Sequence, residues 1–111
     1  MGDRANVYVH GGKNPGVYLY THWGRRSIGE TVAAALDRGR GRWDDEQYLA
    51  RIIFCEMVRD DIEGVTGYGI SAEVWDGAES IVDVDTRTGL VTVKGVETPF
   101  EDFVEGGGNE S

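Results

Sequence analysis

The sequence of 111 residues is short of cysteine and of long apolar runs. Its only cysteine is Cys55, so no intramolecular disulfide bond can form, which suits a reducing compartment. No apolar run approaches the ~18 residues of a membrane-spanning helix, and the opening MGDRANVYVH lacks the apolar core of a signal peptide. We therefore expect a cytoplasmic protein without a membrane partner, able to bury a core without a disulfide or metal.

Basic residues are also scarce, with 11 Lys and Arg against 20 Asp and Glu and a net charge of −9. Residues 1–43 hold seven basic and three acidic groups, whereas residues 44–111 hold four basic and seventeen acidic groups. Because nucleic-acid binding needs a dominant basic surface, direct nucleic-acid binding is not expected. The acidic half either provides solubility or attracts a basic partner by mimicking nucleic acid. Acidic groups or solvent are expected to neutralise the Gly-Arg stretch at 38–42.

Motifs that would identify a known chemistry are missing. GGKNPG at 11–16 lacks the spacing of a phosphate-binding loop and precedes no predicted helix. No Ser-His-Asp ordering, paired-glutamate motif or HExxH motif is present. His10 and His22 could join Asp83 or Asp85 around a metal, but zinc needs three or four well-aimed ligands and the spacing is a weak signal for them. We expect no cofactor and no metal, and the balance favours a protein that is not an enzyme.

Alternation of apolar and polar residues predicts strands on both sides of a helical middle segment. Residues 5–10 and 17–22 alternate around a Gly-rich turn, which predicts a β-hairpin. In that hairpin Tyr8 should face Tyr18 or Tyr20 across the ladder. The same signal predicts three further strands, at residues 70–75, 81–85 and 90–94.

Two helices are predicted between these strands. Residues 28–38 carry a single apolar stripe that ends before Gly39. A second helix starts with Asp44 as its N-cap, and its residues 48–58 are apolar nearly all round. It is therefore expected to be the central core helix, with Cys55 buried and inert.

These elements predict an α+β two-layer sandwich with a mainly antiparallel five-stranded sheet, in the order β-β-α-α-β-β-β, and two helices on one face. The single domain is expected over residues 1–105, with a last helical turn at 98–104 and a disordered tail at 106–111. The valines of the strands, together with Ile70, should face the helices. The other face would then carry polar and aromatic side chains, among them Tyr8, His10, Tyr18, Tyr20 and His22.

The segments MGDRANVYV, GVYLYTHWGRRS, YLARIIFCEMV and GYGIS, within residues 1–75, resemble a family of short uncharacterised phage and prokaryotic proteins. Members of that family open with MGNRA and a strand, continue with a segment like IYLHWNGG, and then have two helices and a glycine-rich turn into strands. The matching residues here are Gly2, Arg4, Ala5, Tyr18, Leu19, His22, Trp23 and Gly24. Thr21 is an insertion, and Arg25 replaces a glycine that is common there. The resemblance implies a phage or prokaryotic accessory protein and carries no established activity.

The candidate binding surface lies on the hairpin and at its end. Its residues are Tyr8, Tyr18, Tyr20, His22, Trp23, Arg4 and Arg25. Tyrosine and tryptophan suit protein interfaces, so the leading interpretation is a small interaction or modulator protein that binds a protein partner through this face or through its acidic surface. The alternative is a small enzyme or ligand binder with a pocket at the strand end of His22 and Trp23, in which histidine acts as a base. Homodimerisation through the same face and ordinary strand packing are two further interpretations.

Overall fold

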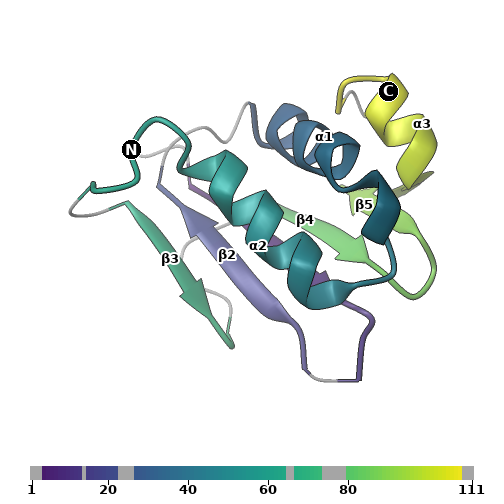
Figure 1. Ribbon diagram of the computed structural model, residues 1–111, viewed down its shortest axis with the longest axis horizontal. Helices are drawn as coiled ribbons and strands as arrows, with labels where there is room; N and C mark the ends of the chain where they lie inside the picture. Colours follow the sequence, from purple (N-terminus) through teal and green to yellow (C-terminus); the bar gives the residue numbers. More distant parts are fainter. Residues whose placement is uncertain (1–3, 14, 23–26, 65–66, 74–79, 109–111) are drawn as a thin grey trace.

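The computed structural model describes residues 4–13, 15–22, 27–64, 67–73 and 80–108 (Figure 1). The chain forms, in order, β1 (Ala5–His10), β2 (Val17–Thr21), α1 (Ile28–Arg38), a short 3-10 helix η2 (Arg40–Arg42), α2 (Glu46–Met57), β3 (Tyr68–Ser71), β4 (Ser80–Asp85), β5 (Leu90–Val93), β6 (Val96–Pro99) and α3 (Phe100–Glu105). The α+β class is confirmed. None of the helices within these ranges has the length and apolar character needed to cross a membrane.

The sheet has six strands in the order β3-β2-β1-β4-β5-β6, one more than expected. Neighbouring strands are antiparallel except β1 and β4, which are parallel. The extra strand is β6, which follows the predicted strand at 90–94 and includes the start of the segment expected to form a helical turn at 98–104. A tight turn separates β5 from β6, and in it Lys94 and Gly95 have φ angles of 52° and 83°. Two consecutive positive φ angles match a hairpin turn that sequence normally signals with Asn-Gly, and Lys-Gly is a weaker signal.

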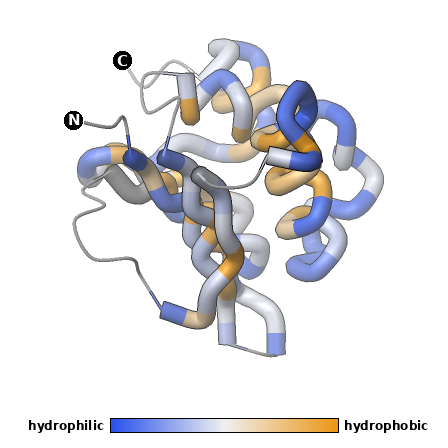
Figure 2. The backbone as a smooth tube through the Cα atoms, turned by 90° about the vertical axis from the view of Figure 1, so that its left-hand side faces the viewer, coloured by the Kyte–Doolittle hydropathy of each residue, from blue (hydrophilic) through white to orange (hydrophobic). Residues whose placement is uncertain are grey.

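Three helices, not two, lie on one face of the sheet (Figure 2). α2 packs over β1 and β2, and α3 packs over β5 and β6. Trp43 joins α1 to α3, because its indole N–H donates to the Leu36 carbonyl at 2.8 Å and its ring meets Phe100 edge-on with centroids 5.4 Å apart. Phe100 and Phe103 are buried, so the predicted last helical turn is part of the core.

The core lies between the valine face of the sheet and the helices, as the alternation predicts. The buried strand residues are Ala5, Val7, Val9, Leu19, Val82, Val84 and Val91, and the buried helix residues include Val32, Leu36, Leu49 and Ile53. Each valine, leucine or isoleucine among them contributes about 1.5–3 kcal/mol when it is fully removed from water. The register places Tyr8 directly opposite Tyr18, one of the two expected pairings.

The prediction that α2 is enclosed on several sides is wrong. Only Leu49 and Ile53 of this helix are buried, and Cys55 is exposed. The reason is that α2 covers β1 and β2 at the margin of the helical layer, so one side of the helix faces solvent above β3. The helix also starts one residue later than expected, since the Asp45 carboxylate, not that of Asp44, accepts the capping hydrogen bond from the Tyr48 N–H at 3.0 Å.

Ile70, on β3, also shows that the helical layer ends before the edge of the sheet. It pairs directly with Leu19 and therefore projects towards the helical side, as expected. However, Leu19 is 1% exposed and Ile70 is 60% exposed, because no described helix reaches over β3. The expectation that Ile70 is buried is wrong for this reason.

The basic stretch at 38–42 is neutralised by acidic side chains, as predicted. Arg40 contacts Asp37 at 2.8 Å and Glu101 at 2.7 Å, and Arg42 contacts Asp45 at 3.3 Å. The contact to Glu101 ties η2 to α3, which is far away in the sequence.

The chain after α3 makes a glycine turn. The N–H groups of Gly106, Gly107 and Gly108 donate to carbonyls of residues 102, 104 and 103. Gly108 has a φ of 85° and lies so close to Gly29 that a Cβ there would overlap the Gly29 backbone. The last part of the expected tail, residues 109–111, lies outside the described residues.

Glu56 joins α1 to the end of α2. Its carboxylate contacts Arg38 at 2.9 Å and Arg59 at 2.7 Å, and its side chain is 14% exposed. The hydrogen bond from Arg59 outweighs the opposing effect of burial and lowers the pKa of Glu56 below its ordinary value of 4.5. The stability that this carboxylate contributes is therefore present above pH 4.5 and is lost as the pH falls below that value.

Leu19 and Ile70 form a matched pair for testing the margin of the helical layer. Leu19→Ala should lower the free energy of unfolding by about 3 kcal/mol, because it opens a cavity in the core. Ile70→Ala should lower it by less than about 1 kcal/mol, because the side chain is already largely in water. Urea unfolding followed by circular dichroism measures both values. Equal losses would contradict the exposed position of β3.

Glu56→Gln should lower the free energy of unfolding by about 1 kcal/mol at pH 7, since the two arginines lose their charged partner. The loss should be smaller at pH 3, below the ordinary pKa of 4.5, because the stability that the wild-type carboxylate contributes declines in that direction. Urea unfolding at both pH values measures the difference, with Glu97→Gln on exposed β6 as a control for charge alone. An equal loss at both pH values would show that the ion pairs contribute nothing.

Candidate functional site

The face of the sheet opposite the helices carries a stack of aromatic rings, here called the tyrosine face and defined by Tyr8, His10, Tyr18, Tyr20 and His22. The Tyr8 ring stacks on Tyr18 with centroids 4.3 Å apart, and on its other side on His10 at 4.5 Å. The rings are nearly parallel, with interplanar angles of 18° and 14°. The strand register produces this stack, because Tyr8 and Tyr18 are directly opposed and His10 follows two residues along the same face.

The stack ends at a carboxylate. The Nε2 atom of His10 lies 2.6 Å from Oδ1 of Asp83, and both side chains are partly exposed, 25% for the histidine and 37% for the aspartate. The parallel pairing of β1 with β4 brings these residues together, since it aligns Tyr8 with Asp83. Alternation along the predicted strand at 81–85 places Asp83 on the same face as Tyr8 and His10, but the contact itself joins residues 73 positions apart and gives no local signal in the sequence.

The other end of the tyrosine face is polar. The Tyr20 hydroxyl lies 3.1 Å from Nδ1 of His22, and the His22 backbone N–H donates to the Gly67 carbonyl at 2.7 Å. His22 thus lies directly after β2, as expected. The contact between a histidine and a carboxylate described above involves His10 and Asp83. The alternative interpretation of the sequence, a small enzyme, has its catalytic base at His22.

Of the remaining predicted site residues, the structure describes only Arg4. Arg4 is exposed just before β1. Trp23 and Arg25 lie outside the described residues, so the expected pocket at the strand end falls outside them as well.

Asn6 is a polar residue that the sequence analysis did not single out. It lies opposite Tyr20 in the ladder and is fully buried. Neither polar atom of its side-chain amide has a hydrogen-bond partner among the described residues. Burying such a group without a partner costs about 1–3 kcal/mol, so the Asn6 side chain lowers the free energy of unfolding.

The possible metal ligands are not gathered around one point. Asp85 turns into the β4–β5 connection, where it accepts from the N–H groups of Arg87 and Thr88 at 2.9 and 3.3 Å. Although burial acts to raise it, these hydrogen bonds keep the pKa of Asp85 below its ordinary value. Within the described ranges, no three His, Cys, Asp or Glu side chains are grouped so that they could hold a metal ion.

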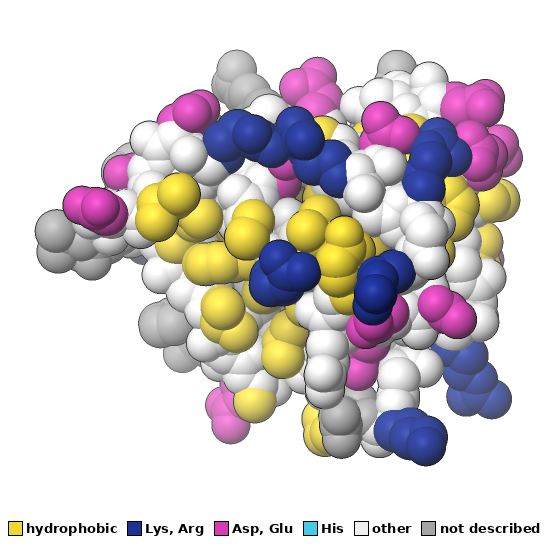
Figure 3. All heavy atoms as spheres, viewed as in Figure 1, with side chains coloured by type: hydrophobic (Ala, Val, Ile, Leu, Met, Phe, Trp, Pro, Cys, Tyr) yellow, Lys and Arg dark blue, Asp and Glu magenta, His cyan; other side chains and the backbone are white. Residues whose placement is uncertain are grey.

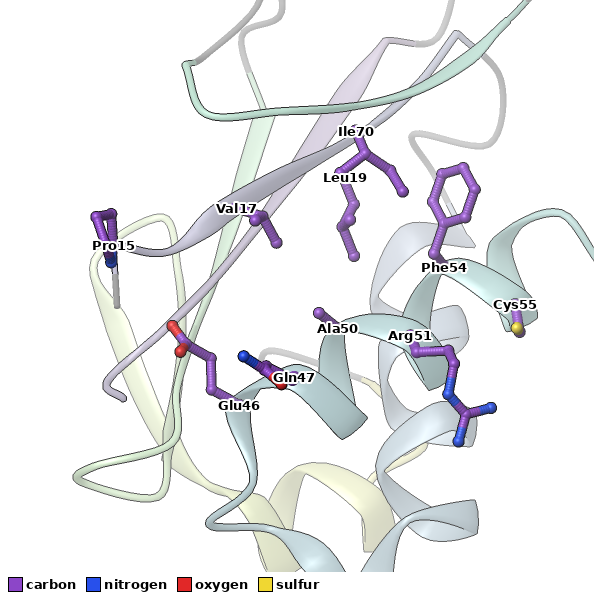
Figure 4. Close-up of a pocket in the computed structure, with 10 residues that line it drawn as sticks. All are labelled: Pro15, Val17, Leu19, Glu46, Gln47, Ala50, Arg51, Phe54, Cys55 and Ile70. Atoms are coloured by element: carbon purple, nitrogen blue, oxygen red, sulfur yellow. The ribbon is translucent and has the colours of Figure 1, made fainter. Parts of the chain in front are cut away.

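A second surface, which the sequence analysis missed, lies on the helical side of the sheet (Figures 3 and 4). It is a groove of about 440 Å³ between α2 and strands β2 and β3, here called the edge groove. Its lining residues are Pro15, Val17, Leu19, Glu46, Gln47, Ala50, Arg51, Phe54, Cys55 and Ile70. The largely apolar pattern of residues 48–58 was the available signal, but it indicated burial without showing that part of the helix lacks a cover.

Comparison of the chain with protein-family models, with curated proteins and with solved structures found no match. The resemblance over residues 1–75 therefore stays a prediction.

The reactivity of Cys55 tests directly whether one side of α2 is exposed to solvent. Because its thiol is exposed, native protein should react with Ellman's reagent at a rate within about tenfold of the urea-unfolded chain. The chain has one cysteine, so the absorbance reports this site alone. A thiol that reacts only after unfolding would show that α2 is enclosed, as the sequence pattern had indicated.

Proposed function

We propose that this protein is an interaction protein, without catalytic activity, that binds a basic protein partner through the tyrosine face. The observation that carries the proposal is the stack of Tyr18, Tyr8 and His10, which ends at Asp83 on the side of the sheet opposite all three helices.

Aromatic rings held in a stack are well suited to binding. Tyr8 and Tyr18 are fixed by each other and by the strand register, so they lose little conformational freedom when a partner covers them. Tyrosine rings present a large area with a polar hydroxyl, which is typical of residues that dominate interface energetics.

Charge favours a basic partner over an acidic one. The chain carries a net charge of −9, and Asp83 lies directly beside the ring stack. An arginine from a partner could lie over a tyrosine ring while its guanidinium approaches this carboxylate. The same negative field would accelerate the encounter with a basic surface.

The resemblance to phage and prokaryotic accessory proteins adds a context. In that context the partner would be a host factor whose activity this protein modulates, for example one with a basic surface that normally contacts nucleic acid. The net charge supports this proposal through mimicry of a polyanion.

The second candidate function is a small enzyme or small-ligand binder. His10 and Asp83, 2.6 Å apart, have the arrangement of a base and the carboxylate that orients it. This pair would need a substrate site beside it, so the aromatic stack supports protein binding more directly.

Affinity purification from the native host, using wild type, Tyr18→Ala and Tyr48→Ala in parallel, tests the proposal. Tyr48 lies on the helical side of the sheet. Tyr48→Ala is the matched control, because it also removes an aromatic ring but leaves the tyrosine face unchanged. A specific partner should be retained by wild type and Tyr48→Ala, lost with Tyr18→Ala, and weakened as the salt concentration rises. Each variant should keep a cooperative thermal transition.

Two results would overturn the proposal. A partner retained equally by Tyr18→Ala would place the interface elsewhere on the molecule. A mass of twice the monomer in light scattering, abolished by Tyr18→Ala, would show that a second copy covers the tyrosine face.

A further inference from the structure

The edge groove exists because the helical layer stops short of the sheet edge. α2 contacts β1 and β2, while β3 is the terminal strand of the described sheet. Figure 4 shows Val17, Leu19 and Ile70 projecting from the strands towards α2, where Ala50 and Phe54 face them. The result is an apolar trough with Phe54 and Ile70 at one end.

The other end of the trough carries a carboxylate. Glu46, the first residue of α2, points towards Pro15, as Figure 4 shows. Its Oε2 atom is buried and has no hydrogen-bond partner among the described residues. The nearest basic side chain of the lining, Arg51, points away from the strands and places its guanidinium over the Tyr48 ring at 5.2 Å. The positive end of the helix favours the Glu46 charge but does not supply Oε2 with a hydrogen bond.

We infer that the edge groove binds a small amphiphilic amine, with its apolar chain along Val17, Leu19 and Phe54 and its ammonium group on Glu46. A volume of about 440 Å³ lies in the range of small-molecule sites, which are mostly apolar with a few polar groups that fix orientation. A charge-assisted hydrogen bond from an ammonium group would give the Glu46 carboxylate the donor that it lacks within the described residues.

The size and charge of the groove favour a small molecule over a macromolecule. The groove is short, because the helix rises only about 12 Å from Glu46 to Phe54. A contact of this length covers much less surface than the area of about 800 Å² that each partner buries in a stable protein interface. A second copy of the chain would bring another net charge of −9 to a groove that already contains the Glu46 carboxylate. This inference does not depend on the tyrosine face, which lies on the opposite side of the sheet.

The test compares three probes that share one chain and differ in head group: decylammonium, decanol and decanoate, each below its aggregation concentration. Titrations followed by amide resonances of the full chain should show decylammonium binding at least about tenfold more tightly than decanol, with decanoate weakest. The shifted resonances should lie in β2, β3 and α2. Bound decylammonium should also slow alkylation of Cys55, which is exposed and lines the groove.

Three variants separate recognition from general attraction to an acidic protein. Glu46→Gln keeps the shape of the side chain and should bring the affinity for decylammonium down to that for decanol. Glu97→Gln removes the same charge from exposed β6, outside the groove, and should leave both affinities within about twofold of wild type. Ile70→Thr should weaken the binding of decylammonium and decanol by similar factors, because it removes part of the apolar wall of the groove and leaves Glu46 in place.

The inference is overturned if decylammonium and decanol bind equally, if Glu97→Gln weakens decylammonium as much as Glu46→Gln, or if no probe shifts the groove resonances. Groove resonances that move with protein concentration alone would identify a second copy as the occupant and overturn it as well. None of these results bears on the partner of the tyrosine face.

Discussion

The structure depends on burial of one valine-rich face of the sheet against the helices. Val7, Val9 and Val84 lie in the central strands β1 and β4 and are fully removed from water. Strand periodicity then leaves no choice for the residues between them, because a side chain that precedes or follows an inward valine must project from the other face. The tyrosine face is therefore a consequence of the core, and its aromatic stack is ordered by the same register that aligns the valines.

The helical layer is narrower than the sheet, and this mismatch produces the second surface. Three helices cover the strands from β2 to β6, but β3 extends beyond them. An apolar side chain can therefore project towards the helical side and still be in water, as Ile70 does. The outer side of α2 remains partly uncovered for the same reason, so Cys55 and three polar or charged residues, Glu46, Gln47 and Arg51, line a groove that also has apolar walls.

The charge distribution links the two surfaces to the rest of the molecule. The arginines of the stretch at 38–42 are engaged by nearby acids, as Arg40 is by Asp37 and Glu101. This leaves the excess of acidic groups, and not the basic stretch at 38–42, as the charge available to a partner. The proposed partner of the tyrosine face and the proposed ligand of the edge groove are both cationic, and each would meet a specific carboxylate, Asp83 or Glu46.

The sequence by itself determined the helix at 28–38, the hairpin that brings Tyr8 opposite Tyr18 or Tyr20, and the division between valines and tyrosines, because these follow from local periodicity and turn chemistry. The structure decided that the partner is Tyr18. Only the tertiary structure decided that His10 meets Asp83, since the parallel pairing of β1 with β4 joins residues far apart in the chain. It also decided the exposure of Ile70 and Cys55. An apolar pattern shows which side of an element favours burial, but whether another element covers that side depends on how far the neighbouring layer extends.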